Sequence, residues 1–243
     1  MDENYLPTLF SQMDQRNCSA FRVGLGRTRN GGYLFPDLRH WPHLLIGGAL
    51  KNDTSRVLQV IVSTLNARAT EKQISLLLIN CSGSNFSASG GMPLLLRPVI
   101  TEPKAAEEAL MALESEISRR LTLMPRAAES LPRLIVVVDE FSPLLRTDNG
   151  VFLSFVMKVA PIGRRVGVHL ILATSDPCEE TLPGILRAHI PSRLALRTLN
   201  AAHSRLLLDQ SGAQNLRGHD MLYFPADSEE PLLLREFSAS GRY

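Results

Sequence analysis

An apolar segment that ends in two acids carries the residues best suited to chemistry. Residues 134–138 read LIVVV, and Asp139 and Glu140 follow directly. At the carboxyl end of a buried strand, an aspartate can hold Mg²⁺ and an adjacent glutamate can orient or deprotonate an attacking water. We therefore take Asp139 and Glu140 as the candidate catalytic pair. The alternative is a strand whose first exposed residues happen to be acidic.

A second motif lies upstream, in a segment that is expected to run from strand through loop to helix. The apolar residues 43–46 lead into Gly47 and Gly48, and Ser55 follows at the start of a helical pattern. The spacing follows the phosphate-binding pattern G-x-x-x-x-G-K-[ST], in which backbone N–H groups and the lysine hold phosphates and the hydroxyl binds Mg²⁺. Ser55 and Asp139 are thus the candidate Mg²⁺ ligands.

This loop departs from the pattern where a triphosphate would be held. Aligned on Gly48 and Ser55, the second glycine is replaced by Asp53 and the lysine by Thr54. A carboxylate about 4 Å from a phosphate in a partly buried site costs several kcal/mol. Lys51 could reach back and replace the missing lysine, although a solvated loop residue is the simpler interpretation. We predict that ATP binding is impaired or lost, and that any ATPase activity is weak or absent.

The elements that must position these residues follow from the hydrophobic pattern. Apolar, β-branched runs predict strands over residues 43–46, 74–79, 134–138 and 168–173, and helical spacing predicts helices over 54–67, 104–121 and about 151–165. This alternation is typical of a buried parallel sheet with helical crossovers. The tail from Arg193 is expected to form short strands and turns that end near Phe237. The glycine-rich segment before Leu34 is expected to form a hairpin, and residues 83–91 a surface loop.

Composition indicates an ordinary soluble protein with one large α/β domain, since 243 residues that are 44% hydrophobic can bury an adequate core. A net charge of +2 neither demands nor excludes a polyanionic partner. Three cysteines far apart favour a reducing cytosol, and His40 and His43 lack further metal ligands nearby. No apolar run is long enough to cross a bilayer. We expect a cytoplasmic protein without direct membrane insertion, which reaches a membrane only through a partner or a missing segment.

Seven segments resemble, in the same order, the motor domain of FtsK/SpoIIIE DNA translocases. They are residues 36–49 (PDLRHWPHLLIGGA), 97–101 (RPVIT), 138–140 (VDE), 167–174 (GVHLILAT), 190–195 (IPSRLA), 204–213 (SRLLLDQSGA) and 220–223 (DMLY). The resemblance covers about residues 35–237 and implies a RecA-like P-loop NTPase fold, with a mostly parallel central sheet flanked by helices and short antiparallel strands at the C-terminus. It implies ATP and Mg²⁺ as cofactors. Residues 34–243 would form this domain, and residues 1–33 an N-terminal hairpin or appendage.

The departures from the family cluster where its chemistry occurs. The family's sensor A-T-Q-R-P reads Ala-Thr174-Ser175-Asp-Pro here, so Thr174 and Ser175 are sensor-like without the glutamine or arginine. Ring ATPases of this type insert an arginine into the neighbouring subunit's site, and Arg164, Arg165 and Arg193 are candidates. The alternatives are a basic helix end for Arg164 and Arg165, and a structural ion pair for Arg193.

Three functions remain open. The first is a structural or regulatory module of a DNA-translocase-like assembly, in a homo- or hetero-oligomeric ring that could contact double-stranded DNA. The second is an active ATP-dependent DNA translocase in which Lys51 replaces the missing lysine. The third is a degenerate ATPase domain of a type VII-like secretion system that binds substrate peptides, since those ATPases resemble the same family.

Overall fold

A computed structural model describes residues 5–41, 43–81, 83, 92–124, 131–147 and 150–236. The strands of these residues fall into two groups. The first comprises β3 (Leu44–Gly47), β4 (Ile74–Ile79), β5 (Arg133–Val138), β6 (Val168–Thr174) and β7 (Ser192–Ala195). The second comprises β1 (Gly26–Thr28), β2 (Tyr33–Leu34), β8 (Asp220–Phe224) and β9 (Leu232–Arg235).

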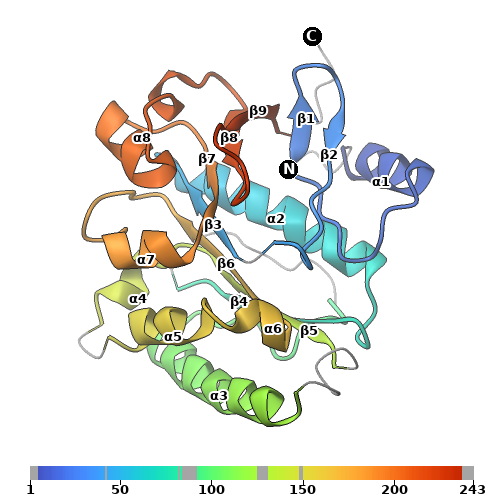
Figure 1. Cartoon of the computed structure of the whole chain (residues 1–243), viewed down its shortest axis with the longest axis vertical. Coiled ribbons are helices and arrows are strands. Elements are labelled where there is room, and N and C mark those ends of the chain that lie inside the picture. The colour runs from blue at the N-terminus through green and yellow to red at the C-terminus, as the bar shows by residue number, and fades with distance from the viewer. Residues whose placement is uncertain are drawn as a thin grey trace.

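All these strands join one mixed sheet in the order β2-β1-β9-β8-β7-β3-β6-β5-β4 (Figure 1). The first group pairs in parallel throughout, while β8, β9, β1 and β2 continue the sheet with antiparallel pairings. This arrangement confirms the predicted fold class, with a mostly parallel centre and short antiparallel strands near the C-terminus.

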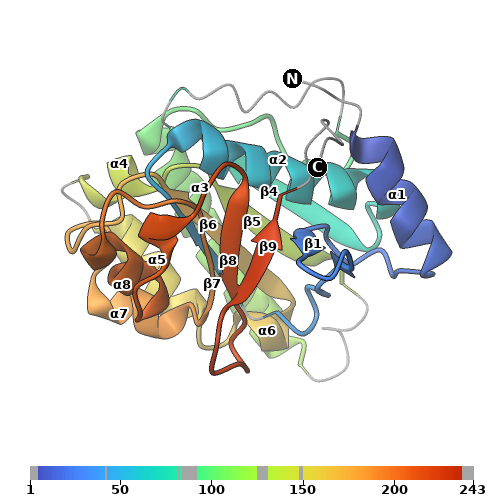
Figure 2. The same ribbon diagram turned by 90° about the horizontal axis from the view of Figure 1, so that it is seen from above.

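Helices cover both faces of the sheet. They are α1 (Tyr5–Gln15), α2 (Lys51–Arg68), α3 (Pro103–Thr122), α4 (Ser142–Leu145), α5 (Val151–Val159), α6 (Gly163–Val166), α7 (Gly184–His189) and α8 (Ala201–Leu208), with a 3₁₀ turn at Ala213–Asn215. Side chains alternate across β5, so that Leu134 and Val136 pack in the core with α3 and α5, whereas Ile135 and Val137 pack in the core with α2. In Figure 2, α1 lies beside α2.

The parallel strands end at a common edge of the sheet. In the strand register, Gly47 at the end of β3 lies beside Thr174 of β6 and Ala195 of β7. Val138, the last residue of β5, lies beside Leu172 of β6. The segments that follow β3, β5, β6 and β7 lead into α2, α4, α7 and α8, whose starts therefore gather at this edge (Figure 1). We call it the carboxyl edge, where open α/β sheets bind their ligands.

The four predicted parallel strands and the helix over 104–121 lie where expected, but the helix predicted over 151–165 is wrong. It is divided into α5 and α6 at residues 160–162. Pro161 has no N–H to donate, and the carbonyl of Ala160 accepts a hydrogen bond from His43 Nε2 at 3.0 Å. Both features end the helical hydrogen bonding at this point.

Four helices of the described residues were not predicted, namely α1, α8 and the two short helices α4 and α7. The tail after Arg193 contains α8 as well as strands, and α8 begins with an N-cap, because the side chain of Asn200 accepts a hydrogen bond from the N–H of His203 at 2.9 Å. Near the N-terminus, α1 packs Leu9 and Met13 against Val60 of α2. Except for Gly83, the loop expected over residues 83–91 lies outside the described residues, as does Phe237.

The hairpin expected before residue 34 is formed by β1 and β2. Arg27 and Thr28 of β1 pair in turn with Arg235 and Leu234 of β9, so the hairpin extends the same sheet. A side chain at Gly26 would place its Cβ 2.6 Å from the carbonyl oxygen of Arg235, so glycine permits this close pairing. Among the described residues, we find no helix that is both long and apolar enough to cross a membrane.

Candidate functional site

The carboxyl edge brings together the two candidate Mg²⁺ ligands. Ser55, in the second turn of α2, donates a hydrogen bond from Oγ to both carboxylate oxygens of Asp139, at 3.0 and 2.8 Å. Asp139 directly follows β5, and both residues are buried, with 6% and 1% of their surface exposed. A hydroxyl and a carboxylate in contact are oxygen ligands of the kind that Mg²⁺ prefers. These two residues would hold the ion, and the geometry of this pair fits that role.

The phosphate-binding segment, by contrast, is already part of a helix. Helix α2 begins at Lys51, three residues before the expected start at Thr54. The N–H groups of Asp53 and Thr54 both donate to the carbonyl oxygen of Leu50, at 3.0 and 3.3 Å. Thr54 Oγ1 donates to the carbonyl oxygen of Lys51 at 2.9 Å. Backbone N–H groups that a phosphate loop aims at its ligand are therefore used inside the first turn of α2.

The residues before α2 are also held by the protein itself. The N–H of Gly48 donates to the carbonyl oxygen of Thr174 at 3.3 Å, and the N–H of Ala49 donates to that of Arg197 at 2.8 Å. A Cβ on Gly48 would lie 2.9 Å from the Cβ of Leu196, so the glycine is required by close packing against the residues after β7. The N–H groups of Gly48 and Ala49, like those of Asp53 and Thr54, thus already have acceptors within the protein.

Asp53 belongs to a charged network that ties α2 to the end of β9. Arg56 Nη2 lies 3.2 Å from Asp53 Oδ1, and the Arg56 guanidinium donates to both carboxylate oxygens of Glu236, at 2.5 and 2.7 Å. The Glu236 side chain is 1% exposed, and His219 Nδ1 lies 3.3 Å from it. The Asp53 carboxylate also stands in the first turn of α2, where it complements the positive end of the helix dipole. The Asp53 carboxylate thus supplies, at the start of α2, the negative charge that a bound anion would supply.

Glu140 is held by hydroxyl groups beside the Mg²⁺ pair. Its Oε1 accepts from Ser142 Oγ at 2.5 Å and from Thr174 Oγ1 at 3.0 Å. Its Oε2 accepts from the N–H and the Oγ of Ser175 at 2.7 and 2.6 Å. Burial raises the pKa of Glu140, but these hydrogen bonds outweigh it, so that the pKa is lowered and the group stays ionised. We call Ser142, Thr174 and Ser175 the hydroxyl cage.

The cage gives the two sensor-like residues a defined contact, and it includes one residue that the sequence analysis missed. Ser142 belongs to no sequence motif. Only its position two residues after Glu140 could have indicated that it contacts this carboxylate. Glu140 also has a φ of 60°, a left-handed conformation that is unfavourable for a residue with a side chain. With both oxygens accepting from the cage, the carboxylate has less freedom to serve as the base for an attacking water.

Replacing Glu140 with glutamine is expected to destabilise the fold by about 2 kcal/mol at pH 7, because an amide cannot accept from the N–H and hydroxyls on both sides of the cage. Since the pKa of Glu140 is lowered from 4.5, its contribution is present above that pH and is lost as the pH falls through the folded-state pKa. In urea denaturation, the difference in stability between the variant and the unmodified chain should therefore shrink as the pH falls below 4.5.

The matched control for this experiment is Glu108→Gln, on the exposed face of α3, which should change stability by less than about 0.5 kcal/mol. A Glu140→Gln variant as stable as this control at pH 7 would mean that the cage contributes nothing to the fold.

The three candidate trans-acting arginines lie in different settings. Arg193, in β7, donates to Asp209 Oδ2 at 2.5 Å and to the carbonyl oxygens of Arg187 and Leu207 at 3.1 and 3.3 Å. Its side chain is 9% exposed, and in this structure it forms an ion pair, the alternative that the sequence analysis gave for Arg193. Arg164 and Arg165 are exposed on α6, which precedes β6 and so lies at the edge opposite Ser55.

The two histidines do not form a metal pair. His43 accepts at Nδ1 from the N–H of Leu170 and donates from Nε2 to Ala160, while burial lowers its pKa to about 4 and keeps it neutral. His40 is exposed. In the part of the chain that the structure describes, no three His, Cys, Asp or Glu residues gather as a metal site would require.

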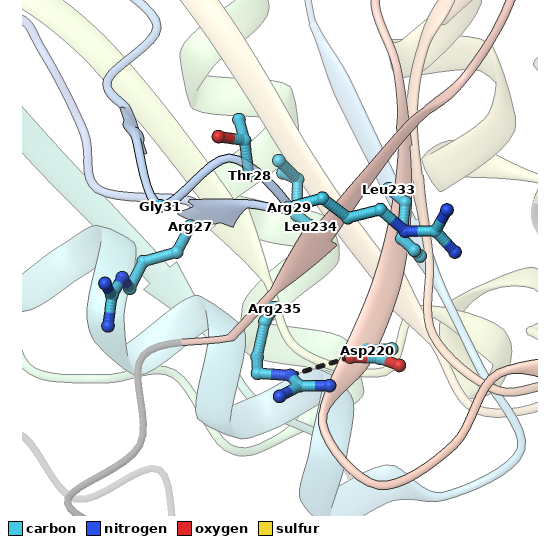
Figure 3. A pocket seen from close by; sticks show the side chains of 8 residues that line it. All are labelled: Arg27, Thr28, Arg29, Gly31, Asp220, Leu233, Leu234 and Arg235. Carbon is cyan, nitrogen blue, oxygen red and sulfur yellow. Dashed lines mark hydrogen bonds and ion pairs between the residues drawn. The ribbon is translucent and has the colours of Figure 1, made fainter. Parts of the chain in front are cut away.

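A basic groove of about 310 Å³ lies between the β1 turn and the β8–β9 pair (Figure 3). Arg27, Arg29 and Arg235 line it against a single carboxylate, Asp220, which pairs with Arg235 Nε at 2.9 Å. In Figure 3, Arg27 and Arg29 point in opposite directions from the turn. The groove therefore presents separate cations along a surface rather than one convergent anion site.

A parallel sheet whose carboxyl edge joins a strand–loop–helix serine to a strand-end aspartate defines the P-loop NTPase class of α/β domains. Residues 7–127 match the family model described as the FtsK/SpoIIIE family. The chain is 32% identical to the DNA translocase FtsK of Halalkalibacterium halodurans, over 92% of this chain and 32% of that protein. It is 29% identical to the DNA translocase SpoIIIE of Bacillus subtilis, over 92% of this chain and 31% of that protein. The chain thus carries a motor domain of the FtsK/SpoIIIE family, and it spans about a third of the length of these relatives.

Solved structures show the same fold at lower identity. The conjugation coupling protein TcpA of pCW3, in its monomer form with ATPγS, has a TM-score of 0.78 at 21% identity, over 91% of this chain and 67% of that one. The cytoplasmic domain of the type VII secretion ATPase EccC of Thermomonospora curvata has a TM-score of 0.78 at 24% identity, over 92% of this chain and 29% of that one.

Proposed function

We propose that this domain is a structural or regulatory module of a DNA-translocase-like assembly and that it binds ATP weakly or not at all. The observation that carries the proposal is the start of α2 at Lys51, which uses the N–H groups of Asp53 and Thr54 within the helix. ATP would have to unwind this turn, displace the Asp53–Arg56 pair and bind without the loop lysine. Ser55 and Asp139 remain able to hold Mg²⁺, but Mg²⁺ alone supplies no translocation.

The polymer that such an assembly handles is proposed to be double-stranded DNA. The curated relatives that match at about 30% identity are named DNA translocases, whereas the likeness to the type VII secretion ATPase rests on 24% identity and concerns the fold. The basic groove supports this choice, because arginines along a surface neutralise the phosphates of a backbone. The alternative of an active translocase depends on Lys51, which is the first residue of α2 and partly buried.

Binding of a fluorescent DNA duplex, with and without Mg-ATP at about 1 mM, tests this function. We expect ATP to change the dissociation constant for the duplex by less than about twofold. The sedimentation coefficient of the protein–DNA complex should also change by less than about twofold. Arg29→Glu in the basic groove should weaken DNA binding about tenfold at low salt, and the control Arg119→Glu on α3 should not. Assembly on DNA that requires ATP, or ATP consumption stimulated by DNA, would contradict the proposal.

A further inference from the structure

Four arginines gather at the amino edge of the parallel strands, which is the edge opposite the carboxyl edge. Arg133 is the first residue of β5, and Arg164 lies on α6, which leads into the neighbouring strand β6. Arg39 belongs to the segment before β3, and Arg120 lies in the last turn of α3. We call these four residues the amino-edge arginines.

Contacts with two further residues bring three of these side chains close together. The guanidinium carbons of Arg39 and Arg133 lie 5.0 and 5.8 Å from the centre of the Phe21 ring, so that two cations share one aromatic side chain. A Cβ on Gly167 would lie 3.5 Å from Nη1 of Arg120 and 4.0 Å from Nη1 of Arg133. Like charges therefore face the same backbone position.

The two acids that pair with the amino-edge arginines are already engaged. Both carboxylate oxygens of Asp37 accept hydrogen bonds from the guanidinium of Arg39, at 2.9 and 2.6 Å. Glu116 accepts from Nε of Arg120 at 2.8 Å, and it also accepts two hydrogen bonds from Arg119. One of these carboxylates thus serves a single arginine, and the other serves two.

Arg133 and Arg164 form no ion pair with any acid that the structure describes. Arg164 lines a pocket of about 540 Å³ with Asp37 and Asp227, but it pairs with neither. Arg133 is half-buried, and within the described chain its one hydrogen bond runs from Nη1 to His169 Nε2 at 3.2 Å. Burial lowers the pKa of Arg133, and the other amino-edge arginines lower it further, although Asp37 acts in the opposite direction. A half-buried cation without a counter-ion is unfavourable for the fold.

We propose that the amino-edge arginines bind a phosphate group, with Arg133 and Arg164 in contact with it. The planar fork of an arginine matches the oxygens of a phosphate, and Arg133 keeps Nε and Nη2 for such a ligand. Four arginines against two engaged carboxylates favour a phosphate over a single carboxylate. The phosphate belongs either to a DNA backbone or to a small free anion, and both present the same oxygens. The site is separate from the nucleotide edge and from the basic groove.

Inorganic phosphate is the first probe. Its phosphorus NMR line should broaden saturably in the presence of the protein, with a dissociation constant of about 10 mM or below. Arg133→Gln should weaken phosphate binding at least about fivefold, and Arg164→Gln about threefold, because each removes one charged donor. The matched control is Arg205→Gln, an exposed arginine on α8, which should leave phosphate binding unchanged.

Stability gives a second readout, which a merely structural role of Arg133 would not produce. In low salt without phosphate, Arg133→Gln should not lower the urea midpoint, because it removes a cation that has no counter-ion. Phosphate at about ten times its dissociation constant should raise the folding equilibrium constant of the unmodified chain about tenfold, relative to chloride of equal ionic strength. The variant should gain less than about threefold under these conditions.

A duplex of about 20 base pairs separates the two sources of the phosphate. If Arg133→Gln weakens both duplex and inorganic phosphate binding, the site holds a DNA backbone. If only inorganic phosphate binding is weakened, the site holds a small anion. Arg29→Glu in the basic groove should leave inorganic phosphate binding unchanged, so that failure of the groove and failure of this site are distinguishable.

The proposal is overturned if inorganic phosphate shows no saturable broadening. It is equally overturned if Arg133→Gln and Arg164→Gln bind phosphate as well as the unmodified chain does, or if hexaglutamate binds more tightly than phosphate and loses its affinity in these variants.

Discussion

Replacing Asp53 with glycine and Thr54 with lysine is expected to raise the affinity for Mg-ATP by at least about 100-fold, or about 2.7 kcal/mol. Glycine removes the carboxylate and weakens the first turn of α2 by about 1 kcal/mol, which favours an open loop. Lysine restores the cation that pairs with the β- and γ-phosphates. Because Thr54 is 1% exposed and bonded to Lys51, the new side chain requires the turn to open.

Isothermal calorimetry on three variants separates the causes of this gain. Asp53→Ala alone removes the repulsion but adds no cation, so it should recover only part of the affinity. Lys51→Ala on the unmodified chain tests the alternative in which this residue holds the phosphates. No gain in the double variant would mean that the two substitutions are not what limits ATP binding.

Replacing Arg56 with alanine is expected to destabilise the fold by about 3 kcal/mol, because it leaves Glu236 buried without its cation. The Glu236 side chain is 1% exposed and takes both hydrogen bonds of its bidentate pair from Arg56. His219 lies nearby but is half exposed, and a single contact cannot replace the bidentate one. Urea denaturation of the variant should show a lower midpoint with an unchanged slope.

The matched control is Arg119→Ala, which breaks an exposed pair with Glu116 on α3 and should cost less than about 1 kcal/mol. Arg56→Lys keeps the charge but not the two parallel hydrogen bonds, so its loss of stability should lie between the two. If Arg56→Ala is as stable as the control, the network does not anchor α2 to β9.

The central strands and the contact between Ser55 and Asp139 could be predicted because their signals are local. Buried parallel strands read as continuous apolar runs, and the acids after residues 134–138 mark the end of such a run. Ser55 and Asp139 are 84 positions apart, yet the strand–loop–helix order predicts that they share the carboxyl edge. Their hydrogen bond is the structural counterpart of that prediction.

Other features depend on contacts that no local pattern reveals. Helix α2 starts early because the carbonyl oxygen of Leu50 accepts hydrogen bonds from two N–H groups. The phosphate-loop pattern had predicted an open loop for these residues. Helix α1 is stabilised by packing on Val60, and the division between α5 and α6 involves His43 from a distant strand. Ser142 became relevant only when the fold placed it against Glu140 and Thr174.

The most direct test of the account is the affinity of the unmodified chain for ATP, measured by calorimetry with Mg²⁺ in excess. If the first turn of α2 closes the phosphate-binding segment, no binding should be detected up to about 1 mM ATP, while the Asp53→Gly/Thr54→Lys variant binds. A dissociation constant in the micromolar range for the unmodified chain would contradict the account, and would place an active translocase first.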